Sequence, residues 1–151
     1  MPIGLGSGVN AVAAARDALG VDCEVVGVVS ARARAYQLSF ERGEIVESPA
    51  STQICDGMAC RTPNAEAMDG IWRSVARIVS VSDSEVAEAI RFCFSATHNV
   101  AEGAGAAALA AALKEEQDPE RAIGIVLSGG NVDRALYARV LAGESFGAET
   151  A

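Results

Sequence analysis

A chain of 151 residues, half of them hydrophobic, is long enough for one domain with a sizeable core. Its formal net charge of −8 argues against nucleic acid or an anionic membrane as the main partner, because both require a basic face. The four cysteines form no C-x-x-C pair, no apolar run is long enough to span a membrane, and no secretory leader opens the chain, so we expect a cytoplasmic protein with reduced thiols and no zinc site.

The first thirty residues predict a glycine loop, a helix and a strand. Residues 10–19 are strong helix formers, and Gly20 suits the position just past a helix end. The valine-rich run 23–30 is typical of a strand buried on both faces of a parallel sheet. This order matches a βαβ unit that lacks its first strand.

The middle of the chain predicts two helices separated by a long loop, and then a second strand. Residues 31–44 could form a helix that ends near Gly43, and residues 65–75 could form the next one. The polar, turn-like stretch 48–63 is typical of a loop over an active face. Residues 77–82 predict a strand.

A capping box predicts where the following helix begins. Ser82 and Glu85 form an S-x-x-E pattern, which is a helix start signal. Val86, Ile90 and Phe94 then recur at helical spacing as one apolar stripe.

The last third of the chain predicts a buried helix, a strand with a glycine turn, and a terminal helix. These elements cover 102–116, 122–131 and 132–143. Helices alternate with strands throughout, so we expect an α/β fold with an open, mostly parallel sheet flanked by helices. The expected domain is 1–142, followed by a short acidic tail at 143–151.

Glycines near the start of the chain have the pattern of a phosphate-binding loop. Gly4, Gly6 and Gly8 let successive backbone N–H groups face one anion, and the helix that follows adds its positive N-terminal end. A tight turn without a ligand is an equally good interpretation. A dinucleotide site is a weaker one, because the third glycine comes one position early and no acidic residue ends the second strand.

Three further stretches have residues suited to a ligand site. Ser128 and Gly129 follow the expected last strand, where open α/β sheets bind ligands, although Asn131 could equally make this stretch a simple helix cap. Glu102 precedes a helix that is too apolar to be exposed, and is either a first-turn helix charge or a site carboxylate. The pair Asp56-Gly57 alone indicates only a turn.

Together and in this order, "PIGLGSG", "CDGMA", "VAEGAGAAALAA" and "VLSGGN" resemble the second half of the serine/threonine dehydratases, which are fold-type II, tryptophan synthase β-like, pyridoxal-phosphate (PLP) enzymes. The resemblance implies PLP as cofactor and β-elimination of L-threonine or L-serine to a 2-keto acid and ammonia. It further implies a phosphate cradle at the glycine loop, a Ser128 hydroxyl at the pyridine nitrogen, a carboxylate of Glu102 near the ring, and a backbone approach to the substrate at Gly57. The implied cofactor-binding residues are Gly4, Leu5, Gly6, Ser7, Gly8, Glu102, Ser128 and Gly129, and the implied substrate-side residues are Asp56 and Gly57.

The chain departs from this family in its lysines. The Schiff-base lysine of the family lies upstream of these motifs, whereas Lys114, the only lysine present, has the sequence context of a solvated helix face. We therefore expect the chain alone to be inactive. Three explanations stay open: the chain is a truncation, it is half of an enzyme completed by a complementary N-terminal half, or it is a non-catalytic ligand-binding or assembly module. A homo-oligomer is also expected, because the family is oligomeric. The resemblance also implies where a metal could lie, because some family members bind a divalent cation through carboxylates in the loop after the second strand. Residues 30–40 contain no acidic side chain, so no such metal site is expected.

Overall fold

The computed structural model describes residues 1–115, 118 and 120–146. Two strands, β1 (Val26–Ser30) and β2 (Arg77–Val81), pair in parallel along their full length. Pro2 forms a parallel bridge to Val28, so residues 1–3 add the beginning of a third strand at the other edge of β1. The expected α/β class with a small parallel sheet between helices is confirmed.

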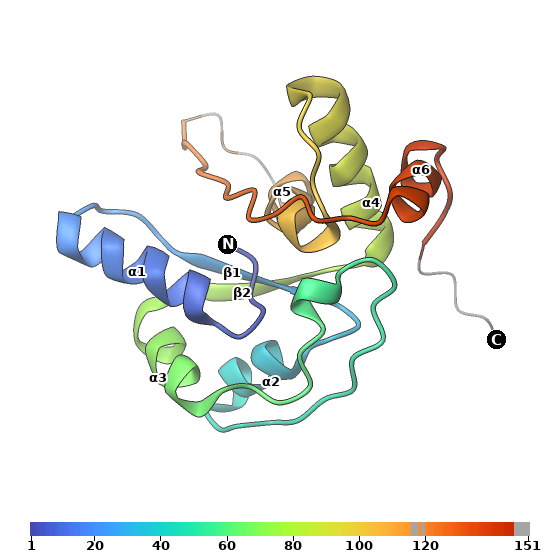
Figure 1. The fold of residues 1–151 in the computed structure, drawn as a ribbon. Helices are drawn as coiled ribbons and strands as arrows, with labels where there is room; N and C mark the ends of the chain where they lie inside the picture. The colour runs from blue at the N-terminus through green and yellow to red at the C-terminus, as the bar shows by residue number, and fades with distance from the viewer. Residues whose placement is uncertain (116–117, 119, 147–151) are drawn as a thin grey trace.

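Helices cover both faces of this sheet (Figure 1). One face is covered by α1 (Ser7–Leu19), α2 (Ala35–Arg42) and α3 (Ala65–Ser74), and the other by α4 (Asp83–Phe92), α5 (Gly103–Lys114) and α6 (Arg134–Leu141). The loop between α2 and α3 contains one turn of 3-10 helix, η1 (Asp56–Met58), and α4 continues into a π-helical turn, η2 (Cys93–Thr97).

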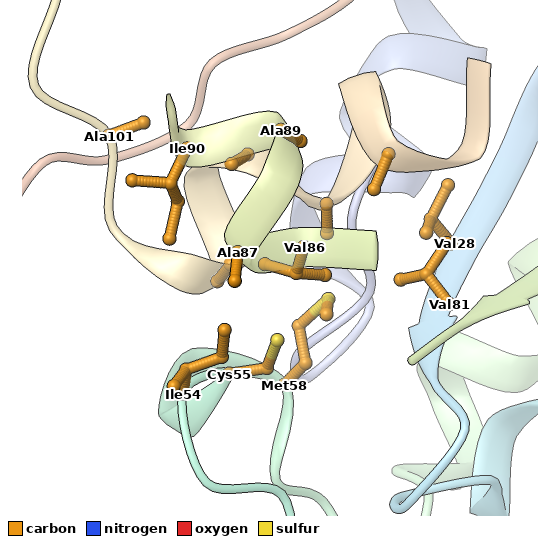
Figure 2. Packing of buried hydrophobic residues seen from close by; sticks show 14 of the residues in the cluster. Val28, Ile54, Cys55, Met58, Val81, Val86, Ala87, Ala89, Ile90 and Ala101 are labelled. Carbon is orange, nitrogen blue, oxygen red and sulfur yellow. The ribbon is translucent and has the colours of Figure 1, made fainter. Parts of the chain in front are cut away.

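The two helix layers enclose two separate hydrophobic clusters. Successive strand residues point to opposite faces of a sheet, so Val28 belongs to the cluster beneath α4 and α5, whereas Val29 belongs to the cluster against α1 and α3. Figure 2 shows Val28 and Val81 beside Val86 of α4 in the first cluster. As predicted, β1 is buried on both faces.

Local signals at helix ends are confirmed. Gly20 and Gly43 both follow a helix in the left-handed conformation, with φ of 62° and 71°. The capping box at the start of α4 is formed in both directions, because the Ser82 hydroxyl accepts from the Glu85 N–H and the Glu85 carboxylate accepts from the Ser82 N–H.

The predicted apolar stripe on α4 is correct for Val86 and Ile90 but wrong for Phe94. The first two side chains are buried, whereas Phe94 is 43% exposed. The helix widens into η2 at Cys93, which changes the angle between successive residues and moves Phe94 off the buried face. Its ring instead contacts Tyr137 edge-on, with 6.1 Å between ring centroids.

The strand predicted within 122–131 is not formed. This stretch is extended, but its backbone pairs with no other strand in the part of the chain that the structure describes. A strand is defined by its neighbour, and hydrophobic pattern alone does not supply one. The helix that follows is shorter than expected, and its N-cap is Asp133, whose carboxylate accepts from two backbone N–H groups, rather than Asn131.

The end of the described chain folds back onto the core. Phe146 is buried, and the Arg139 guanidinium lies 5.4 Å from the centroid of its ring. Residues 147–151 of the expected tail lie outside the described residues, so the domain boundary stays a prediction. No helix of the described residues is long and apolar enough to cross a bilayer.

Candidate cofactor site

The glycine loop leads directly into α1. Gly6 is the N-cap residue and has φ of 89°, a conformation that favours glycine, and α1 receives no side-chain cap. The N–H groups of Ser7, Gly8 and Val9 donate to no acceptor among the described residues, as is usual in a first helical turn without a cap. The loop therefore presents unpaired donors at the positive end of a 13-residue helix.

Tyr36, which the sequence analysis did not single out, fixes this loop. Its side chain is buried, and its hydroxyl donates to the Leu5 carbonyl at 2.8 Å and accepts from the Asn64 N–H at 3.1 Å. One side chain of α2 thus ties the glycine loop to the start of α3. No local motif marks such a residue, because its partners lie 31 and 28 positions away.

The glycine loop packs directly on the stretch that contains Asp56 and Gly57. A Cβ atom on Gly4 would lie 2.5 Å from the Gly57 carbonyl oxygen, so only glycine allows this approach. Gly4, Leu5, Asp56 and Gly57 line one open cleft of about 450 Å³. The structure thereby brings the predicted phosphate cradle and the predicted substrate-side pair together.

The other two stretches meet at the N-terminus of α5. The Glu102 N–H donates to the Gly129 carbonyl at 3.1 Å, and the Glu102 carboxylate lies against the Cα of Gly129. A Cβ atom on Gly105 would collide with the backbone of Gly129, so the glycine at this position lets the first turn of α5 pack directly on that backbone. Glu102 is half-buried, and Ser128, next to Gly129, is exposed.

The start of α5 also connects the two pairs of stretches. A Cβ on Gly57 would lie 3.0 Å from the Ala104 Cβ, and Gly103 packs on the backbone of Ile54 and Cys55. The four predicted stretches are therefore linked in series, from Gly4 to Gly57, from Gly57 to Ala104, and from Glu102 to Gly129. Glu102 and Ser128 do not line the cleft of about 450 Å³ that contains Gly4 and Gly57, so their joint contact with one ligand stays a prediction.

A buried carboxylate holds the loop that carries Asp56 and Gly57. The Asp83 side chain is fully buried and accepts from the Thr52 hydroxyl at 2.5 Å and from the Gln53 N–H at 2.9 Å, with Arg32 Nε at 3.9 Å. Asp83 is also the first residue of α4, where a negative charge is favourable. The S-x-x-E pattern predicts the helix start here, but no local pattern predicts this second role.

The Cys55 thiol, which precedes Asp56 in the same loop, is made unreactive by its burial. Burial is the main reason that its pKa is raised, to about 12, and the nearby Asp83 carboxylate acts in the same direction. A thiol with this pKa stays protonated near neutral pH and cannot serve as a nucleophile.

Lys114 is far from these stretches. It lies in the last turn of α5, whereas Glu102 precedes the first turn, and a 12-residue helix is about 18 Å long. Its ammonium is paired with the Glu85 carboxylate at 3.0 Å and donates to the Ser80 carbonyl at 3.2 Å. The single histidine, His98, is exposed at the end of η2, with Nδ1 3.3 Å from the Phe94 carbonyl.

No group of three or more histidine, cysteine, aspartate or glutamate side chains suited to a metal ion occurs within residues 1–115, 118 and 120–146. The expectation about metal binding stays a prediction.

Comparison with known sequences identifies one family. The sequence profile of the family described as "Pyridoxal-phosphate dependent enzyme" matches residues 1–129. The L-threonine ammonia-lyase of Thermotoga maritima is 29% identical over 141 residues, which cover 93% of this chain and 35% of that protein. The L-threo-3-hydroxyaspartate ammonia-lyase of Pseudomonas sp is 35% identical over 145 residues, which cover 93% and 45%.

Solved structures agree with this result. The T.th. threonine deaminase superposes with a TM-score of 0.78 at 31% identity, covering 87% of this chain and 48% of that one. Maize serine racemase superposes with a TM-score of 0.81 at 26% identity, covering 94% and 45%. The chain thus spans between 35% and 48% of the length of these four relatives.

Proposed function

Since the chain belongs to the pyridoxal-phosphate-dependent enzymes, we propose that it is the phosphate-binding half of an ammonia-lyase that converts a small hydroxy amino acid, L-threonine or L-serine, to a 2-keto acid and ammonia. The observation that carries this proposal is the glycine loop, which leads into unpaired N–H groups at the start of α1 and lines, through Gly4 and Leu5, the cleft shared with Asp56 and Gly57. The names of the relatives support the substrate class, since ammonia-lyases of threonine and hydroxyaspartate are among them.

The residues of the glycine loop fit a phosphate group. Three N–H groups, those of Ser7, Gly8 and Val9, donate to no acceptor among the described residues, and the absence of a side chain at Gly4 and Gly6 lets the loop pack closely on Gly57 and Ala67. The α1 dipole adds a favourable potential for an anion at this end. In this proposal the cradle anchors the cofactor and fixes its direction.

Two polar side chains would complete the contacts to the cofactor ring. The Ser128 hydroxyl would meet the pyridine nitrogen, and a hydroxyl, unlike a carboxylate, does not hold a proton there. When bound, PLP supplies the electron-withdrawing ring that lets the substrate lose its Cα proton, and an unprotonated ring favours early loss of the β-hydroxyl. Glu102 would lie beside the ring, and the Gly57 backbone would approach the substrate.

The catalytic amine must come from elsewhere. Lys114 is ion-paired and lies at the opposite end of α5 from Glu102, whereas a lysine that forms a Schiff base must be close to the cofactor and neutral. We therefore expect the chain alone to bind PLP without turnover. A second candidate function, a non-catalytic ligand-binding module, is favoured by the same position of Lys114, and differs in that no complementary polypeptide restores turnover.

A single charge tests the phosphate cradle. In Ser7→Glu, a carboxylate replaces an exposed hydroxyl at the first position of α1, where helices tolerate acidic residues but a phosphate would be repelled. Ser84→Glu makes the same replacement at an exposed first-turn position of α4 and serves as the matched control. We expect equilibrium dialysis to show at least a tenfold loss of PLP affinity in Ser7→Glu and none in Ser84→Glu.

Inorganic phosphate should compete with PLP in the same assay. Equal affinities of the two variants, or binding insensitive to phosphate, would exclude the glycine loop as the cradle.

A further inference from the structure

A groove between α1 and α3, called here the α1–α3 groove, has a volume of about 690 Å³, which is within the range of small-molecule sites. The proposed function leaves it unused, because Gly57 lies in a different cleft, which shares only Leu5 with this groove. One stripe of side chains on each helix forms a wall, and these stripes include Asn10, Ala14 and Asp17 of α1 and Gly70 and Arg73 of α3.

Two hydrogen bonds hold the walls of the groove in place. The Asn10 amide donates to the Ala67 carbonyl at 2.9 Å, and the Arg16 guanidinium donates to the Ser74 carbonyl at 3.1 Å. A Cβ atom on Gly70 would lie 2.5 Å from the Asn10 side chain, so the glycine lets the two helices pack closely here. The groove is thus preformed, and a ligand does not have to order it.

One end of the groove carries two charged groups that can bind a ligand. Arg16 contacts Asp17 through one carboxylate oxygen, Oδ1, at 2.7 Å, and the other oxygen of Asp17 accepts from no described residue. Arg73 forms no hydrogen bond or ion pair within the part of the chain that the structure describes. Asp17 and Arg73 lie at the same end, because each is one position from the contact between Arg16 and Ser74. This end therefore offers an acceptor for an ammonium and a donor for a carboxylate.

The other end of the groove carries a third charge, Glu66. Its carboxylate has no ion-pair partner among the described residues, and it lies seven positions before Arg73 on the same helix, about 10 Å along the axis of α3. Ala14 and Ala67 form an apolar surface between the two ends. The lining side chains thus carry two negative charges and one positive charge, separated by a short apolar stretch.

We propose that the α1–α3 groove binds a basic α-amino acid of the lysine type, as a second ligand site that does not depend on the proposed function. Its carboxylate pairs with Arg73, its α-ammonium with Asp17 and its terminal ammonium with Glu66. Its methylene groups cover Ala14 and Ala67. Charge decides the class of ligand, because two ammonium groups and one carboxylate are the complement of the lining charges.

Titration of the full chain without PLP, followed by two-dimensional NMR, tests the site. L-lysine should shift the amide signals of residues 7–17 and 64–74, with a Kd of about 1 mM or below. Three probes each lack one charge: L-norleucine lacks the terminal ammonium, 6-aminohexanoate lacks the α-ammonium, and 1,5-diaminopentane lacks the carboxylate. Each should bind at least about threefold more weakly, which is the size expected for one exposed ion pair.

Substitutions locate the ligand in the groove. Ala14→Leu fills the groove with a good helix former and should abolish lysine binding. Ala15→Leu changes the neighbouring exposed position of α1, outside the groove, and should leave lysine binding unchanged. Glu66→Gln should remove the preference for lysine over norleucine without changing the affinity for norleucine.

Three results would overturn the proposal. They are equal affinities for lysine and norleucine, equal effects of the two leucine substitutions, and no saturable binding of lysine below about 10 mM. The Ser7→Glu test of the cofactor proposal is separate, because it measures PLP affinity, whereas lysine binding is measured on the chain without PLP.

Discussion

The Tyr36 hydroxyl offers a sharp test of how the glycine loop is held. Tyr36→Phe keeps the buried ring but removes the group that donates to Leu5 and accepts from Asn64. A net hydrogen bond is worth about 1 kcal/mol, and a buried group left unpaired costs about 1–3 kcal/mol. Because two backbone partners lose their bond at once, we expect a loss of about 2 kcal/mol in the free energy of unfolding.

Urea and thermal denaturation measure this loss. For a chain of this size, a change of about 2 kcal/mol lowers Tm by roughly 4–8 °C. The matched control is Tyr137→Phe, because the Tyr137 hydroxyl is buried and has no hydrogen-bond partner within the described residues. Removing an unsatisfied hydroxyl should leave the free energy of unfolding unchanged or raise it slightly.

The difference in the free energy of unfolding between the two variants shows whether the Tyr36 hydroxyl stabilises the loop. If Tyr36→Phe and Tyr137→Phe change the free energy of unfolding equally, the hydroxyl of Tyr36 does not stabilise the loop. PLP affinity should fall in Tyr36→Phe and stay constant in Tyr137→Phe, since only the first residue contacts the loop.

Two further predictions concern the packing around the loop. Cys55 should resist thiol reagents in the folded chain while exposed Cys23 reacts at once. Its pKa is raised to about 12 by burial, so the folded state keeps a proton that the unfolded state loses, and stability should fall by about 1.4 kcal/mol per pH unit as pH rises from about 9 to about 12. Cys55→Ala should flatten this slope in urea titrations, and an unchanged slope would refute the assignment. Gly103→Ala, which forces a Cβ into the Ile54 carbonyl, should cost at least about 2 kcal/mol, whereas Gly124→Ala, with open space around it, should be neutral or stabilising by less than about 1 kcal/mol. Equal Tm values for these two variants would contradict the close packing of α5.

Signals that depend on neighbours within a few residues were readable from the sequence. The left-handed Gly20 and Gly43 and the capping box of Ser82 are all set by contacts within one helical turn, and all three were predicted correctly. The resemblance located four stretches of the site. It could not show that Gly4 packs on Gly57, because that contact spans the whole first third of the described chain.

The predictions that were wrong, and the residues that were missed, depend on structure beyond the nearest neighbours in the sequence. The run 122–127 has the composition of a strand, but a ladder needs a second backbone. Phe94 keeps the helical spacing of Ile90, yet the π-helical turn at Cys93 rotates it toward solvent. Tyr36 and Asp83 act through partners about thirty positions away, a distance at which no sequence motif operates.

The division of the core by β1 has a consequence for how substitutions in this chain should be interpreted. Ile3 and Val9, on either side of the glycine loop, belong to one cluster, whereas Ala101 and Ala104, which flank Glu102, belong to the other. The two walls of the candidate site are thus mounted on separate layers, and their spacing is set by the thin sheet between them together with the contacts of Gly57 to Gly4 and Ala104. A cavity opened in either layer, far from any ligand, would misalign the walls without altering a single residue of the site.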